Sequence, residues 1–126
     1  MAKNSKEWLK QAKYDFGTAQ LMFRGRRHFY AVFMCHLSIE KALKGIYFKK
    51  LKNFPPKTHS LIFLIEKIGI RPSEELLKFL VKIDQASVAT RYPEDLAKLQ
   101  KAYTSLAAKG ILNKTSKVLQ WAEKNF

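Results

Sequence analysis

The chain has 126 residues, and 24 Lys and Arg against 10 Asp and Glu give it a formal net charge of +14. Hydrophobic residues make up 47% and charged residues 27%, which excludes a disordered tail. No apolar run approaches the ~20 residues that span a bilayer, and no apolar segment comes directly after Met1. We therefore expect a single domain over residues 1–126, in the cytoplasm and not in a membrane.

The sequence contains few of the residue patterns that hold metals or cofactors. Cys35 is the single cysteine, which excludes an internal disulfide and a zinc site built from several cysteines. No HExxH pattern and no glycine-rich phosphate loop is present. We expect no metal and no cofactor.

Helical periodicity runs along the chain, and no stretch alternates as a strand does. A first helix is expected from about Ser5 to Arg24, where apolar residues recur every three or four positions and Gly25 supplies a stop. A second is expected from about Phe29 to Leu51, closed by Pro55 and Pro56.

The second half of the chain continues the helical pattern. A short segment opens at Thr58 or His59 and ends at Gly69, and Ser73 then caps a helix that reaches about Ser87. Pro93 interrupts the pattern before a final helix from about Thr104 to Lys124. The residues expected to face inward on that last helix are Ala107, Ala108, Ile111, Val118, Leu119 and Ala122. Four main helices with short connections predict an all-α, antiparallel up-and-down bundle of four to five helices.

The second helix is apolar nearly all round. Its core stripe is expected to contain Val32, Cys35, Ile39, Ala42 and Ile46. The far side, where a surface helix should be polar, carries Tyr30, Met34, Leu37 and Phe48. A helix of this kind must be covered on both sides, so we expect a homodimer through that far side.

Polar residues interrupt the apolar stripes at a few positions. Asp15 lies in an apolar row of the first helix, so it needs a salt bridge, a helix-end role or a functional role. His36 and Glu40, four residues apart, either hold a metal or hydrogen-bond each other, and we favour the second. His59, at a helix start, is expected to cap or to pack.

A basic turn comes after the first helix. Arg24, Arg26, Arg27 and His28 form either a solvated connection or a contact for phosphate. A solvated connection is the commoner role for such a turn.

Three motifs in order resemble the HEPN family (higher eukaryotes and prokaryotes nucleotide-binding). They are Glu40-Lys41-Ala42-Leu43-Lys44, His59-Ser60-Leu61 and Arg91-Tyr92-Pro93, and Asp15 and Thr104 match the family's acidic and capping positions. The resemblance implies a dimeric helical bundle of a small prokaryotic protein, of the Arg-Tyr-Pro type, often paired with a minimal nucleotidyltransferase. It also implies relatives that are metal-independent ribonucleases, frequently toxins of toxin–antitoxin pairs.

The ribonuclease relatives carry an Arg followed after four to six residues by His. After Arg91 the corresponding positions are Leu96, Ala97 and Lys98, and no other Arg–His pair has the spacing. Leu and Ala cannot transfer a proton, and a Lys would need a strongly lowered pKa. The sequence therefore favours a module without catalytic residues.

Three functions stay open. The first is a non-catalytic module that binds a nucleotide, RNA or a nucleotidyltransferase, for which the candidate residues are Arg91, Tyr92, Lys44, His36, Glu40, Asp15 and His59. Arg91 would hold phosphate or instead pair with Asp15 or Glu40; Tyr92 would stack or pack; Lys41 and Lys44 would attract phosphate. The second is a ribonuclease that uses Arg91 with His36 or His59. The third is a nucleic-acid binder that works through charge alone.

Overall fold

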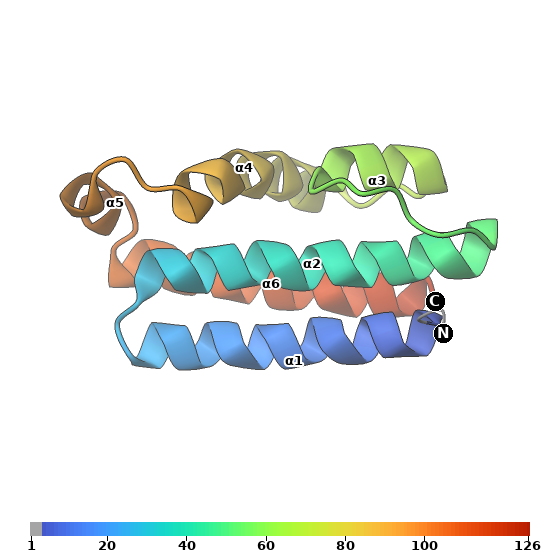
Figure 1. The fold of residues 1–126 in the computed structure, drawn as a ribbon, viewed down its shortest axis with the longest axis horizontal. Coiled ribbons are helices and arrows are strands. Elements are labelled where there is room, and N and C mark those ends of the chain that lie inside the picture. Colours follow the sequence, from blue (N-terminus) through green and yellow to red (C-terminus); the bar gives the residue numbers. More distant parts are fainter. Residues whose placement is uncertain (1–3) are drawn as a thin grey trace.

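The computed structural model describes residues 4–126, and these form six helices and no strand (Figure 1). The helices are α1 (Ser5–Arg24), α2 (His28–Leu51), α3 (Leu61–Ile68), α4 (Glu74–Arg91), α5 (Leu96–Ala102) and α6 (Ser105–Lys124). The prediction of an all-α bundle is confirmed.

Local sequence explains where most of these helices begin. Asn4, Ser60, Ser73, Asp95 and Thr104 each accept a hydrogen bond from a backbone N–H in the first turn of the next helix. Arg27, which precedes α2, offers no such side-chain cap, and the first turn of α2 contains no acidic residue. The start of α2 therefore differs from the other helix starts.

The four long helices run alternately up and down. The chain enters at the end where it also leaves, passes along α1, returns along α2, runs back along α4 and returns again along α6 (Figure 1). The central helix is α2, which contacts α1 along its length and also touches α3, α4, α5 and α6. The short helix α3 lies at the end of the bundle beside the start of α4.

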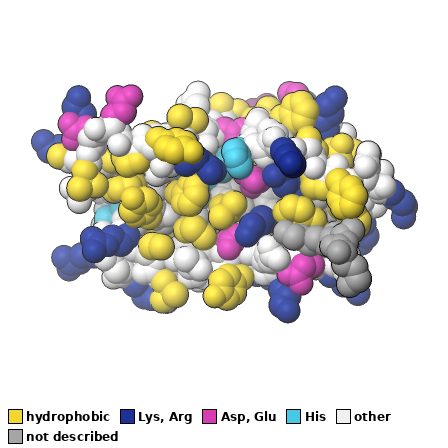
Figure 2. Space-filling model, in the orientation of Figure 1, with side chains coloured by type: hydrophobic (Ala, Val, Ile, Leu, Met, Phe, Trp, Pro, Cys, Tyr) yellow, Lys and Arg dark blue, Asp and Glu magenta, His cyan; other side chains and the backbone are white. Residues whose placement is uncertain are grey.

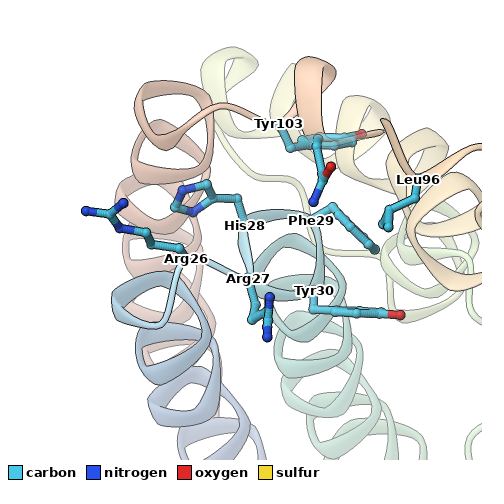
Figure 3. Close-up of a pocket in the computed structure, with 8 residues that line it drawn as sticks. Arg26, Arg27, His28, Phe29, Tyr30, Leu96 and Tyr103 are labelled. Atoms are coloured by element: carbon cyan, nitrogen blue, oxygen red, sulfur yellow. The ribbon is translucent and has the colours of Figure 1, made fainter. Parts of the chain in front are cut away.

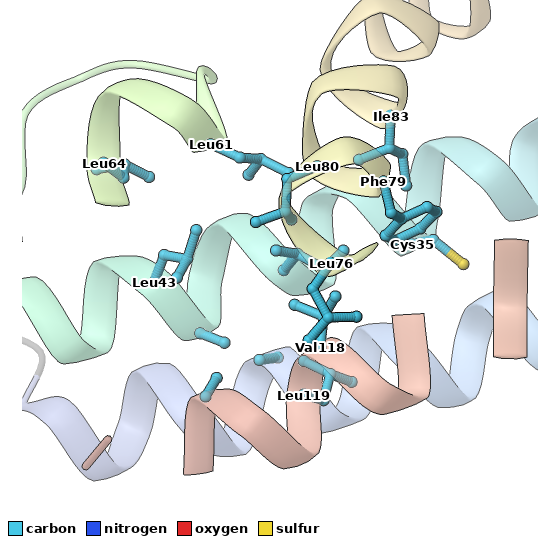
Figure 4. Close-up of a cluster of buried hydrophobic side chains, with 14 of the residues drawn as sticks. Cys35, Leu43, Leu61, Leu64, Leu76, Phe79, Leu80, Ile83, Val118 and Leu119 are labelled. Carbon is cyan, nitrogen blue, oxygen red and sulfur yellow. The ribbon is translucent and has the colours of Figure 1, made fainter. Parts of the chain in front are cut away.

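The core fills the space between α2 and the helices around it. Leu43 and Cys35 of α2 face side chains from α3, α4 and α6 (Figure 4), and the expected stripe along α2 is buried. Cys35 is fully buried, and burial raises the pKa of its thiol to about 12, against a smaller lowering by the Thr115 hydroxyl.

Three details of the prediction are wrong. The fourth helix continues past Ser87 to Arg91, so Arg91 lies on a helix end and not in a loop. The short helix α5, after Pro93, is not predicted from the sequence. On α6, Ala107 is exposed, while Leu112 and Thr115 are buried in its place.

Candidate functional site

Glu40 is the centre of a polar cluster on α2. Its carboxylate is 4% exposed and accepts hydrogen bonds from Lys44 Nζ at 3.1 Å and from His59 Nδ1 at 2.9 Å. A buried carboxylate is costly unless it is paired, so these two donors explain how α2 tolerates it. The His59 side chain is 62% exposed. Because Nδ1 is bonded to Glu40, Nε2 is the ring nitrogen that remains for a further hydrogen bond.

Asp84 of α4 is the centre of a second polar cluster. One carboxylate oxygen lies 2.9 Å from His36 Nε2 and accepts from the backbone N–H of Leu61, and the other accepts from the N–H of Ile62 and from the Ser60 hydroxyl. Burial alone would raise the pKa of Asp84, but the bonds from His36, Leu61 and Ile62 together hold it below its ordinary value. Asp84 therefore fastens the start of α3 and the middle of α2 to α4.

The expectation that His36 and Glu40 bond to each other is wrong. His36 reaches across to Asp84, and Glu40 binds Lys44 and His59. His36 is fully buried, so it is closed to any ligand in solution. His59 does not cap α3 either, because Ser60 and Asp84 take that role.

Arg91, the last residue of α4, lies on the side of α2. Its guanidinium carbon is 4.9 Å from the centre of the Phe33 ring, within range of a cation–π contact. Of the two roles considered for Arg91, the salt bridge to Asp15 or Glu40 does not form, and among residues 4–126 no carboxylate pairs with Arg91. One terminal nitrogen, Nη2, is buried and has no hydrogen-bond partner within the described chain.

The neighbouring charged residues are already paired. Asp15 is buried and lies 2.8 Å from Lys41 Nζ, so the salt bridge, one of the three roles considered for this carboxylate, is the one that the structure shows. Lys44 is bound to Glu40, so neither lysine of the α2 motif carries a free charge as expected for phosphate attraction. Tyr92 is 77% exposed and does not pack on the bundle.

The outward face of α2 is apolar. Tyr30 and four half-buried residues form what we term the α2 face: Tyr30, Phe33, Met34, Leu37 and Phe48. Figure 2 shows hydrophobic side chains gathered over α2 on this side of the molecule, with basic and acidic side chains beside them. The guanidinium of Arg91 lies against this face through Phe33.

The basic turn lies at the start of α2, whereas the Glu40 cluster lies at the middle of that helix. Arg24, Arg26 and Arg27 are exposed, and no ion pair involves them in the part of the chain that the structure describes. Arg26 has a φ of 62°, in the left-handed region that closes the turn.

Neither a metal cluster nor a membrane-spanning helix is present in residues 4–126. Within that range, no group of three or more His, Cys, Asp or Glu side chains is placed to hold a metal ion. No helix there is long and apolar enough to cross a bilayer.

Sequence reasoning missed two residues that the structure places at these sites. Asp84 interrupts an apolar stripe of its helix, between Leu80 and Ser87, which is the same signal that singled out Asp15. Phe33 gave no such signal, because its contact with Arg91 depends on how far α4 extends.

These features define a small all-helical module with an apolar face beside charged residues. The model of the HEPN domain matches residues 5–125, so the chain belongs to the HEPN domain family. A solved structure, TT1696 from Thermus thermophilus, is 23% identical with a TM-score of 0.82, covering 97% of this chain and 98% of that one. ST0689, described as an archaeal HEPN homologue, is 23% identical with a TM-score of 0.77, covering 98% of both chains. At this identity the likeness concerns the fold, and no curated protein matches the chain.

Proposed function

We propose that this protein is a non-catalytic HEPN module that binds the phosphate of a nucleotide or RNA through Arg91. The observation that carries the proposal is the unpaired guanidinium at the edge of the α2 face. Guanidinium groups bind phosphate through two parallel hydrogen bonds. The Phe33 ring packs against the Arg91 guanidinium and would hold it in place. The exposed Tyr92 ring, next in the chain, offers a surface for a base.

Dimerisation is the second part of the proposal. Tyr30, Met34, Leu37 and Phe48 would meet their copies across a two-fold axis that runs past α2. The apolar character of the α2 face supports this arrangement, because α2 already has α1, α3, α4 and α6 against its other sides. Such a dimer would bring the two Arg91 side chains to one interface.

The protein partner that we propose is a minimal nucleotidyltransferase, in a pair of the toxin–antitoxin kind. The support is the resemblance of the motifs, together with a +14 charge that suits an acidic partner surface. Size-exclusion chromatography of the two purified proteins, mixed and separate, tests this part by the appearance of a joint peak.

Phosphate binding is tested with a short single-stranded RNA and Arg91→Gln. We expect this variant to bind the RNA about tenfold more weakly, since charged hydrogen bonds are lost, and Arg91→Lys to restore part of the affinity. Arg71→Gln is the matched control, because it removes one exposed arginine elsewhere. Equal affinity of Arg91→Gln and the wild type, or an equal loss in the control, would show that Arg91 does not bind the RNA.

A second function is favoured by one observation. His59, oriented by Glu40 and exposed, resembles the carboxylate–imidazole pair of a general base. On α2, Glu40 is seven residues from Phe33, so the residue that bonds His59 and the residue that contacts Arg91 are about 10 Å apart along the helix axis. A ribonuclease would then use Arg91 and His59, and not His36. RNA cleavage without added metal that is lost in His59→Ala would establish this alternative.

A further inference from the structure

A groove runs between α4 and α6. It consists of two adjoining hollows of about 260 and 300 Å³. Phe79, Lys82 and Ile111 line both hollows, so the two form one continuous groove. On α4 the lining residues extend from Lys78 to Ala89, which is about 16 Å at the helical rise of ~1.5 Å per residue. The groove is therefore long enough to hold about three turns of another helix.

The floor of the groove is apolar. Phe79 and Ile83 of α4 are buried and Ile111 of α6 is half-buried, so these side chains form a base without charge. Ala107 and Gly110 line the α6 side, and a Cβ at Gly110 would meet no atom of the described chain within 4 Å. Because the residues on this side are small, apolar side chains of a partner can reach the floor.

The rim of the groove is positively charged. Lys78 and Lys82 line it from α4 and Lys114 lines it from α6, and all three are exposed. Among residues 4–126 no carboxylate pairs with any of them, and the residues that line the two hollows include no Asp or Glu. About one turn further along α6, Lys117 already pairs with Glu75 at 3.8 Å. The rim therefore carries positive charge that the described chain leaves uncompensated.

We infer that this groove binds an acidic amphipathic helix of a partner protein. An amphipathic helix binds in a groove through apolar residues that are three, four and seven positions apart. Here these residues lie on the apolar floor, and Glu or Asp side chains on the flanks of the helix pair with the three lysines of the rim. Leu106, which lines the groove and is 83% exposed, is covered by the bound helix.

Two other occupants fit the groove less well. A second copy of this chain carries the same net charge of +14, so its surface is repelled by the lysines of the rim. A polynucleotide pairs with the lysines through its phosphates but makes no use of the apolar floor between them. An acidic helix uses both parts of the surface.

The inference does not rest on the proposed function. Neither Arg91 nor any residue of the α2 face lines the groove, so the phosphate contact and the dimer can both exist while the groove is occupied. The partner is defined here by its charge and its apolar stripe, and it need not be a nucleotidyltransferase.

The test uses two fluorescent synthetic peptides about four turns long. The first has Leu at every third or fourth position and Glu on both flanks, and the second has the same composition in an order that removes the apolar stripe. By fluorescence anisotropy at ~0.15 M salt, we expect the first peptide to bind with a Kd below about 100 µM and the second at least about tenfold more weakly. Equal affinities, or no binding of the first peptide, would overturn the inference without affecting the RNA measurement with Arg91→Gln.

A matched pair of variants on α6 locates the peptide. Lys114→Glu reverses a charge on the rim, and we expect it to weaken binding of the first peptide about tenfold. Lys109→Glu makes the same change on the same helix, at an exposed residue that lines a hollow between α1 and α6 instead, and it should leave the affinity nearly unchanged. An equal loss in both variants would show attraction to the overall charge and not binding in the groove.

A third variant tests the apolar floor. Ala107→Trp fills the groove from an exposed position without changing the charge, and we expect it to abolish binding of the first peptide. Circular dichroism checks that the variant keeps its fold. Unaltered affinity in the folded variant would overturn the inference. A short single-stranded RNA that displaces the peptide from the wild type, and that Lys114→Glu no longer binds, would assign the groove to nucleic acid instead.

Discussion

Asp84 connects three segments that are distant in sequence. It accepts from the His36 ring on α2 and from backbone N–H groups at the start of α3, while its own backbone is on α4. Removing the carboxylate would leave a buried imidazole and two helix-end donors without their acceptor, and each such group costs about 1–3 kcal/mol. The residue is therefore structural in its main effect.

We predict that Asp84→Ala lowers the free energy of unfolding by about 3 kcal/mol near pH 7. Asp84→Asn should cost less, because its amide oxygen still accepts one of the bonds. Urea unfolding followed by circular dichroism measures both values. A change below about 0.5 kcal/mol for the alanine variant would contradict the role given to this carboxylate.

Asp84 should also make the free energy of unfolding depend on pH. The folded protein holds the pKa of Asp84 below its usual value, so ionised Asp84 stabilises the fold above about pH 4. This stability is lost as the pH falls through the lowered pKa. The difference in unfolding free energy between wild type and Asp84→Asn should therefore shrink from about pH 5 to about pH 2. An unchanged difference over that range would show that the charge is not what matters.

The sequence showed that a buried polar residue needs a partner wherever that residue interrupts a regular apolar pattern. It did not always show which residue the partner is. The need of Asp15 for an ionic partner followed from its position in an apolar row, and Lys41 supplies that partner. Asp84, the partner of His36, and His59, one partner of Glu40, did not follow, because each lies on a different segment whose position depends on how α3 and α4 fold back. Spacing along one helix cannot show a contact of this kind. Lys44, the other partner of Glu40, is four residues away on the same helix.

The long helices could be predicted from the sequence because each carries several turns of apolar repeat and a recognisable start. Ser73 and Gly69 are found where capping rules place them, and Gly69 adopts a φ of 81°. Helix α5 has seven residues, none of them buried, so it offers no periodicity to detect. Because α4 continues to Arg91 and α5 begins at Leu96, the connection after Arg91 is shorter than a loop from residue 88 to residue 103 would be.

Substitution by Ala should have opposite effects on stability at two glycines, Gly45 on α2 and Gly110 on α6. A Cβ on Gly45 would approach the Trp8 Cβ to 2.8 Å, and that atom is fixed to the α1 backbone. Gly45→Ala should therefore destabilise the protein by about 1–3 kcal/mol. A Cβ on Gly110 would meet nothing within 4 Å, so Gly110→Ala should stabilise α6 by about 1 kcal/mol.

Thermal unfolding of the two variants measures the effect, with the wild type as reference. Both are Gly→Ala changes inside helices, so the helix propensity gain is the same and the difference reports packing alone. If Gly45→Ala raised the melting temperature as Gly110→Ala does, the close approach of α1 to α2 would be wrong.

At the scale of the whole molecule, the apolar α2 face predicts association. We expect the wild type to sediment as a dimer at micromolar concentration and Leu37→Glu to sediment as a monomer, because a carboxylate at the centre of an apolar interface is costly. Val81→Glu, at an exposed valine of α4, is the control and should remain dimeric. A monomeric wild type would show that the dimer part of the proposal is wrong. The phosphate contact at Arg91 would then depend on the RNA-binding measurement alone.

A candidate binding site was harder to predict from the sequence than the fold. The fold depends on repeats that are visible along the chain. A cavity at the start of α2, by contrast, is lined by the turn after α1 and by side chains far along the chain, such as Leu96 and Tyr103 (Figure 3). The high positive charge pointed to anions in general. It did not distinguish the arginines at the cavity from Lys41 and Lys44, which are neutralised by Asp15 and Glu40.

The fully buried Cys35 gives the protein an internal probe. It is the single thiol of the sequence, and its high pKa keeps it protonated and unreactive in the folded state. An alkylating reagent can modify it only after α2 separates from its neighbours, so the rate of modification reports how often the bundle opens. Because no other thiol competes, a nucleotide that binds the folded form would slow that reaction in proportion to its occupancy.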